Sequence, residues 1–136
     1  MKERVLILCT GNSARSQMAE GLLRHLHGDR FEVASAGTRP GTVRQEAIAV
    51  MAEMGIDIGN HRSKHVDEFK HQLFDYVLTV CDNAREACPI FPASVRLIHH
   101  SFDDPAALEG TVAERLALFR RVRDEIRLYL DTFPAQ

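Results

Sequence analysis

One stretch near the start of the chain decides its fold: Val5-Leu6-Ile7-Leu8-Cys9-Thr10-Gly11-Asn12-Ser13-Ala14-Arg15-Ser16. The four apolar residues 5–8 predict a short buried strand, and the small polar residues after them predict a tight turn. The apolar residues that follow are spaced for one face of a helix: Met18, Ala19, Leu22, Leu23 and Leu26. A strand that passes through a tight turn into a helix gathers backbone N–H groups where the helix dipole favours negative charge. The stretch therefore predicts an anion-binding loop.

Cys9 and Arg15 stand at the two ends of this turn. We expect their thiol and guanidinium to point into one bowl that suits a tetrahedral oxyanion, with the loop N–H groups around its oxygens and Arg15 binding two of them. The same positive field predicts a lowered pKa for Cys9, which makes it a thiolate nucleophile at neutral pH. The alternative is an inert buried cysteine beside a surface arginine. The small residues between the two disfavour it: Gly11, Ser13 and Ala14.

Length and composition restrict the class of protein. The 136 residues predict one domain, residues 1–136, with 45% hydrophobic and 26% charged residues, which is ordinary for a soluble chain. A formal net charge of −2 without a basic tract argues against a nucleic-acid partner. No apolar run approaches the ~20 residues of a membrane span, and the charged start lacks a secretory segment, so we expect a cytoplasmic protein. Three cysteines favour catalysis or metal binding over a disulfide framework.

Strand and helix patterns alternate along the rest of the chain. The expected strands cover residues 31–35, 75–80 and 95–98 besides 5–8, and the expected helices cover 44–54, with Gly55 after its end, and the segment after Thr111. Thr111 and Glu114 form a capping box at the start of that last helix. The alternation predicts an α/β fold: a single three-layer domain with a four-stranded parallel sheet and helices on both faces. Ligands bind such sheets at the carboxyl ends of the strands, which hold Cys9 and Cys81.

A second pair of cysteines, Cys81 and Cys88, begins where the third expected strand ends. If the segment between them is helical, their Cα atoms lie roughly 10 Å apart, whereas a disulfide needs about 7 Å. Oxidation would then have to unwind the helix, which predicts a redox switch. Two alternatives remain open: a pair of inert core thiols, and a metal site that adds His99 and His100 to the two cysteines. The remaining histidines are expected at the surface: His25, His27, His61, His65 and His71.

An acidic turn, Asp103-Asp104-Pro105-Ala106, follows the fourth expected strand. A carboxylic acid beside the thiolate can protonate a leaving oxygen. His99 and His100 lie close in sequence and are candidates to tune it. The alternative is a solvated aspartate turn before a helix.

The residues 9–16 resemble the phosphate-binding loop of the low-molecular-weight protein tyrosine phosphatase fold, and residues 10–20 resemble the arsenate reductases of that fold. The resemblance extends over essentially the whole chain. Its other parts are Ser35-Ala36-Gly37-Thr38, Gly55-Ile56-Asp57-Ile58, the Cys81 and Cys88 pair, and Phe102-Asp103-Asp104-Pro105-Ala106. Together they are similar to the thioredoxin-coupled arsenate reductases.

This resemblance implies a mechanism without a cofactor or a bound metal. Cys9 attacks arsenate, Asp104 helps water to leave, and Cys81 and Cys88 carry the resulting disulfide outward to thioredoxin in a protein that acts as a monomer. Phosphate and sulfate would compete for the loop. Asn12 and Ser16 would hold the loop and hydrogen-bond the Cys9 thiolate. The residues implied to contact the oxyanion are Thr10, Gly11, Asn12, Ser13, Ala14, Arg15 and Ser16.

The chain departs from the resembled family at two places. Relatives bind potassium through an Asn, a Glu and a Thr-Ser-Asp segment; Asn12 and Glu20 are present here, but the segment reads Arg62-Ser63-Lys64. We therefore expect the Lys64 ammonium to replace the ion. His100-Ser101 also stands where relatives have Trp-Gly, beside Asp104.

Two other functions fit parts of the pattern. A low-molecular-weight protein tyrosine phosphatase would act through a Cys9 phosphoenzyme, but such enzymes place an aromatic residue where Ala106 stands and do not need Cys88. A non-catalytic oxyanion-binding module would leave the combination of Cys9, Arg15 and Asp104 unexplained.

Overall fold

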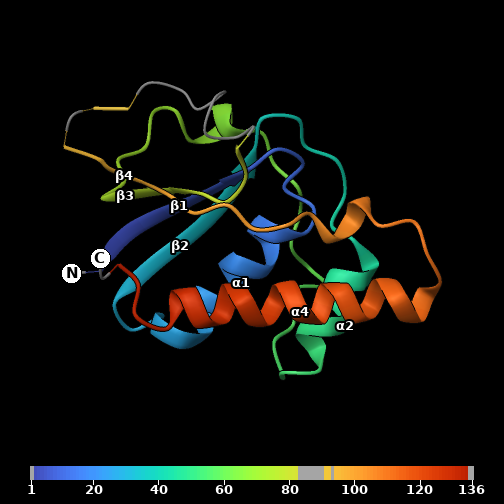
Figure 1. Ribbon diagram of the computed structural model, residues 1–136. Helices are drawn as coiled ribbons and strands as arrows, with labels where there is room; N and C mark the ends of the chain where they lie inside the picture. The colour runs from blue at the N-terminus through green and yellow to red at the C-terminus, as the bar shows by residue number, and fades with distance from the viewer. Residues whose placement is uncertain (1, 83–90, 93, 135–136) are drawn as a thin grey trace.

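The computed structural model describes residues 2–82, 91–92 and 94–134. Its centre is a parallel sheet of four strands in the order β2-β1-β3-β4 (Figure 1). The strands are β1 (Glu3–Cys9), β2 (Phe31–Gly37), β3 (Tyr76–Thr79) and β4 (Arg96–His99). Each lies where the sequence predicts a strand, so the predicted four-stranded parallel sheet is confirmed.

The central position of β1 follows from its composition. Residues 5–9 are all buried, as in a parallel strand that is covered on both faces. Cys9 lies beside Gly37 of β2, and Leu8 lies beside Thr79 of β3. The carboxyl ends of these strands therefore meet at one edge of the sheet, and the chain leaves that edge at Cys9 and at Cys81.

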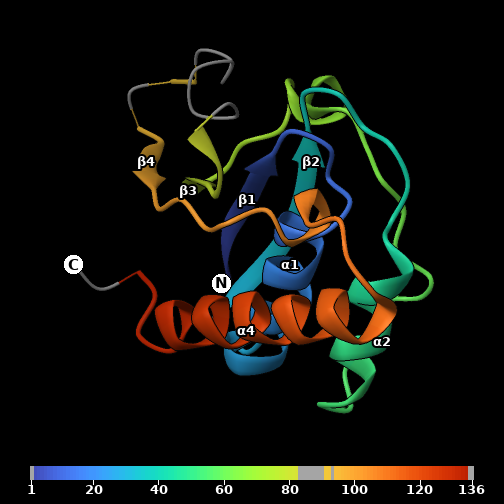
Figure 2. The same ribbon diagram turned by 45° about the vertical axis from the view of Figure 1, so that its right-hand side comes forward.

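Three α-helices pack together on one side of the sheet (Figure 2). They are α1 (Arg15–His27), α2 (Gln45–Ala52) and α4 (Val112–Leu130). The predicted capping box starts α4: the Glu114 N–H donates to Thr111 Oγ1 at 3.1 Å, and the Thr111 N–H donates to Glu114 Oε1 at 2.9 Å. The buried stripe of this helix faces α1 and α2 with Phe119, Val122, Ile126 and Leu130.

The other side of the sheet is bordered by the short 3₁₀ helix η1 (Val66–Phe69), which lies away from the three α-helices in Figure 1. Val66 is buried there.

The helix predicted over 44–54 is shorter than expected, since α2 covers Gln45–Ala52. A turn then leads to Gly55, whose φ of 74° is the left-handed conformation that its predicted place after the helix requires. None of the helices described here combines the length and apolar character that crossing a bilayer demands.

Candidate active site

The Cys9 loop, residues 9–15, joins the end of β1 to the start of α1. Its carbonyl groups are bound from outside by the next loop along the sheet edge: the N–H of Arg39 donates to Thr10 O at 2.8 Å, and the N–H of Arg44 donates to Ser13 O at 2.8 Å. Since the N–H of each peptide unit points away from its carbonyl, the N–H groups of Gly11 and Ala14, which share peptide units with these carbonyls, face the inner side of the loop. A Cβ on Gly37 would lie 2.5 Å from Thr10 O, so the loop is held close to β2.

Asn12 holds this loop in shape. Its φ of 47° is left-handed, and its side chain is fully buried. The amide nitrogen donates to Ser16 Oγ at 2.8 Å and to Ser35 Oγ at 2.9 Å. The amide oxygen accepts from Gln17 Nε2 and from the Lys64 N–H, each at 3.0 Å. Ser35 and Gln17 lie in stretches that carry the family resemblance, but only the structure shows that their side chains hydrogen-bond Asn12.

Arg15 is fixed at the start of α1 with its guanidinium turned to the chain after β4. Its Nη1 donates to Phe102 O at 3.0 Å, and its Nη2 lies 3.7 Å from Asp104 Oδ2. Its Nε is buried and has no hydrogen-bond partner among the described residues. An unpartnered buried donor of this kind is costly, so it points to an acceptor that binds here.

The two neighbouring aspartates face different ways. Asp104 precedes the 3₁₀ helix η2 (Pro105–Ala107), accepts the Ala106 N–H at 3.0 Å, and keeps its second oxygen near Arg15. Asp103 instead pairs with Arg121 of α4 at 2.7 Å. Of the two carboxylates, Asp104 is therefore the one placed beside the Cys9 loop.

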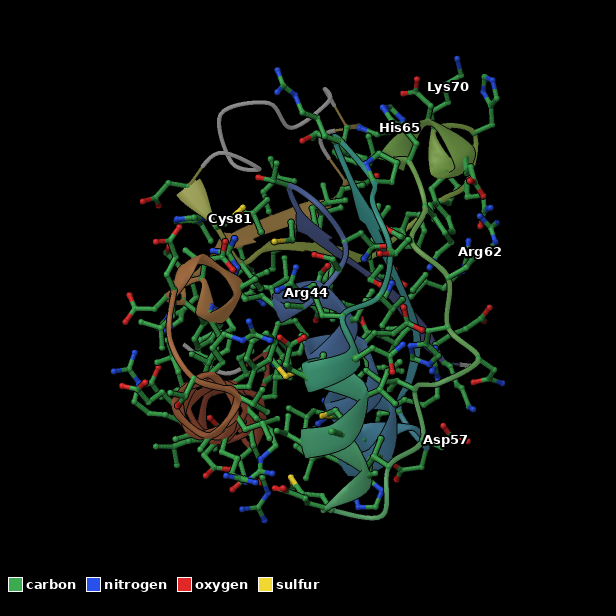
Figure 3. All side chains as sticks on the ribbon, turned by 90° about the vertical axis from the view of Figure 1, so that its right-hand side faces the viewer. Arg44, Asp57, Arg62, His65, Lys70 and Cys81 are labelled. Atoms are coloured by element: carbon green, nitrogen blue, oxygen red, sulfur yellow. The ribbon has the colours of Figure 1, made fainter. Side chains whose placement is uncertain are left out.

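The structure also brings the first two cysteines together. Cys9 and Cys81 are both buried, with exposed fractions of 3% and 4%, and Cys81 is the group that raises the pKa of Cys9 most. Thr10 Oγ1 lies 3.3 Å from Cys81 Sγ. Figure 3 shows Cys81 above and to the left of Arg44, whereas Arg62 and Lys70 project at the right-hand edge of the molecule. Ser16 Oγ accepts from Asn12 Nδ2, and the expected hydrogen bond from Ser16 to Cys9 stays a prediction.

The expectation of a lowered pKa at Cys9 is wrong for this arrangement. The hydrogen bond with Cys81 and the burial of the sulfur raise the pKa of Cys9, and they outweigh Arg15 and the Thr10 N–H, which lower it. The sequence prediction considered the positive groups of the loop and not the effect of the neighbouring Cys81 thiol on the pKa of Cys9. The raised pKa favours the thiol form of Cys9 in this arrangement.

Cys88 and the expected helix between the cysteines fall in residues 83–90, outside the described residues.

The two histidines of the alternative metal site turn to different partners. His99 Nε2 lies 2.9 Å from Asp82 Oδ1, and the His100 ring stacks on Tyr129 with ring centroids 4.1 Å apart. Neither of these contacts involves Asp104, which the two histidines were candidates to tune.

Lys64 approaches the buried carboxylate of Glu20, as expected, with its Nζ 4.0 Å from Glu20 Oε1. Arg24 donates to the other oxygen at 2.7 Å. Burial lowers the pKa of Lys64, and Glu20 opposes that shift.

His61 is not the surface residue that the sequence predicted: it is half-buried, and its Nδ1 lies 2.9 Å from Gln17 Oε1. Burial also lowers the pKa of His61.

The whole site lies inside one family match. The family model described as low molecular weight phosphotyrosine protein phosphatase matches residues 4–135. The chain belongs to this family. Among its relatives, an arsenate reductase of Halalkalibacterium halodurans is 46% identical over 132 residues, which cover 97% of this chain and 95% of the relative.

Solved structures place this member of the low molecular weight phosphatase family among arsenate reductases as well. An arsenate reductase in its oxidised state superposes with a TM-score of 0.81 at 29% identity, covering 95% of this chain and 94% of the other. An arsenate reductase in a phosphate-binding state superposes with a TM-score of 0.71 at 30% identity, with the same coverage. These likenesses extend over the sheet, the Cys9 loop and the helices alike.

Proposed function

We propose that this protein reduces arsenate to arsenite through a thiol relay of Cys9, Cys81 and Cys88 that thioredoxin regenerates. The place of Cys81 against the Cys9 loop carries the proposal: its Sγ lies 3.3 Å from Oγ1 of Thr10, the residue after Cys9, and it is the largest influence on the pKa of Cys9. The 46% identity with an arsenate reductase over nearly the whole chain supports the same activity.

Arsenate binds in the Cys9 loop. The inward N–H groups of Thr10 to Ser16 hold its oxygens, and the unpartnered Nε of Arg15 supplies a buried charged donor. The phosphate-binding state of a related arsenate reductase supports an oxyanion at this place. Phosphate and sulfate have the same tetrahedral shape and compete with arsenate.

In the first step the Cys9 sulfur forms a bond to arsenic while an As–O bond breaks. Asp104, held near Arg15, gives the leaving hydroxide a proton so that it departs as water, and the thiol proton of Cys9 passes to an oxygen of the arsenate. Since Cys81 and burial favour the thiol form of Cys9, we expect the bound oxyanion to draw that proton as the sulfur attacks.

In the second step Cys81 attacks the Cys9 sulfur. The electron pair of the S–As bond stays with arsenic, which is reduced from As(V) to As(III) and leaves as arsenite, while the two sulfurs form a disulfide. Thr10 Oγ1, at 3.3 Å from Cys81 Sγ, is placed to hydrogen-bond the attacking thiolate.

In the third step Cys88 attacks Cys81, which frees Cys9 and leaves a Cys81–Cys88 disulfide. Thioredoxin then returns two electrons and restores the three thiols. This route needs no cofactor or bound metal, and it belongs in the reducing cytoplasm with a monomeric enzyme.

The combination of Cys9, Arg15 and Asp104 also supports phosphoryl transfer, and we expect a weak phosphatase activity. A phosphatase finishes its cycle by hydrolysis and uses no second sulfur. The position of Cys81 against Cys9 favours reduction as the main reaction, since a redox cycle has to end in a disulfide.

The test is a single turnover with arsenate and no reductant, followed by arsenite assay and mass spectrometry of disulfide-linked peptides. We expect Cys88→Ser to release about one arsenite per enzyme and to stop as a Cys9–Cys81 disulfide that thioredoxin reduces poorly. Cys81→Ser should stop earlier, before normal arsenite release, and Cys9→Ser should release none.

Continued turnover of Cys88→Ser with thioredoxin would contradict the relay. Arsenite release by Cys9→Ser above the level without enzyme would contradict the nucleophile assignment. Hydrolysis of phosphate esters by wild type without any arsenite release would favour the phosphatase.

A further inference from the structure

A histidine bridge lies beside Cys81. His99, the last residue of β4, places its Nδ1 2.7 Å from Thr79 Oγ1 and its Nε2 2.9 Å from Asp82 Oδ1. A carboxylate can only accept a hydrogen bond, so Nε2 carries the proton in the second contact. The His99 imidazole thus joins Thr79, two residues before Cys81, to Asp82, the residue after Cys81.

The backbone on either side of this bridge is also fixed. The His100 N–H donates to Thr79 O, and the Phe102 N–H donates to Val80 O, each at 3.0 Å. These bonds continue the pairing of β3 and β4 past their ends, up to the carbonyl that precedes Cys81. Beyond Cys81, the contact between Asp82 and His99 is the side-chain link back to β4.

The bridge contributes little to stability by itself. The Asp82 side chain is 76% exposed, and exposed ion pairs stabilise proteins weakly. Its effect is geometric, because it limits how the chain that carries Cys81 can move relative to β1, where Cys9 lies.

We propose that His99, together with Asp82, is a positioning residue that holds Cys81 in line to attack the Cys9 sulfur. The inference rests on the proposed function, because it concerns the second step of that reaction. Neither residue touches arsenate. A displacement of about 1 Å between reacting groups can lower a rate about a hundredfold, so a loose Cys81 would form the disulfide slowly.

The test compares the rate of Cys9–Cys81 disulfide formation among variants made in the Cys88→Ser protein. After addition of arsenate, we expect His99→Ala, which loses both contacts, to be slowed about twentyfold and Asp82→Ala about fivefold. Asp82→Asn keeps an acceptor for Nε2 and should react within about twofold of the parent. His25→Ala, an exposed histidine on α1, is the matched control and should not differ from the parent.

Two further measurements separate positioning from loss of structure. The dissociation constant for inorganic phosphate reports the Cys9 loop and should stay the same in all variants. Diamide oxidises the two thiols to the disulfide by taking two electrons and two protons without arsenate, and the same order of rates is expected with it.

Parent-like rates for His99→Ala and Asp82→Ala with both reagents would overturn the inference. Weakened phosphate binding that parallels the slower rate would overturn it as well, because the role would then be structural. If the parent reacts with diamide but not with arsenate, the proposed function fails, while the order of rates with diamide still decides the role of His99.

Discussion

Asn12 is the residue whose removal should damage the site most without touching a cysteine. Its side chain makes four hydrogen bonds inside the protein, to Ser16, Ser35, Gln17 and the N–H of Lys64. Its backbone is left-handed, with φ of 47°, which asparagine tolerates and alanine does not. Asn12→Ala therefore removes the bonds and strains the backbone at once, whereas Asn12→Gly removes only the bonds.

The size of the effect follows from these contacts. A hydrogen bond contributes about 0.5–1.5 kcal/mol net, and a buried group left without its partner costs more. Ser35 keeps its bond to Glu20, and Gln17 keeps the carbonyl of Arg62, so two of the four partners lose most. We expect Asn12→Ala to lose about 3–5 kcal/mol of unfolding free energy. Asn12→Gly should lose about 1 kcal/mol less, because glycine adopts the left-handed conformation freely.

Urea denaturation measures both losses as a shift of the midpoint at unchanged slope. The loss expected for Asn12→Ala is a large part of the ~5–15 kcal/mol that stabilises a typical domain. Phosphate binding should weaken in both variants, since the loop N–H groups are no longer held in place. A loss below about 1 kcal/mol for Asn12→Ala would refute the assigned bonds, and equal losses for the two variants would refute the backbone contribution.

Three further predictions follow from the site. Asp104→Asn should slow formation of the Cys9 adduct by about 10²–10⁴ without lowering the melting temperature, as measured in a single turnover; an unchanged rate would exclude Asp104 as the acid. Cys81→Ala should lower the pKa of Cys9, because it removes the group that raises that pKa most. Alkylation of Cys9 should then begin at lower pH than in wild type, and an unchanged pH dependence of alkylation would contradict the role of Cys81. Because the Lys64 ammonium lies beside Glu20, melting temperature and turnover should be equal in potassium and sodium chloride at the same ionic strength, and a potassium-specific stabilisation would disprove the replacement.

The local features of this protein could be predicted from its sequence. The strand, turn and helix around Cys9, the four strands and the capping box at Thr111 all appear in the structure where the sequence places them. Each depends on residues within a few positions of one another, through apolar periodicity or a single side-chain bond to the backbone. The order of α/β elements was sufficient to predict a parallel sheet, because parallel strands need crossovers between them.

Features that join distant parts of the chain needed the tertiary structure. The residues by themselves could not show that Cys81 lies against Cys9 or that His99 bridges Thr79 and Asp82. The choice of Asp104 over Asp103 came from the family resemblance alone, and the structure supports it because Asp104 faces Arg15 while Asp103 pairs with Arg121. The strand order places β1 beside β3, which brings the Cys9 and Cys81 ends of these strands together. The turn after β4 decides that the Asp104 side chain faces Arg15. The raised pKa of Cys9 has the same origin, since burial and a neighbouring thiol are properties of the packed molecule, while the sequence shows only the charges nearby.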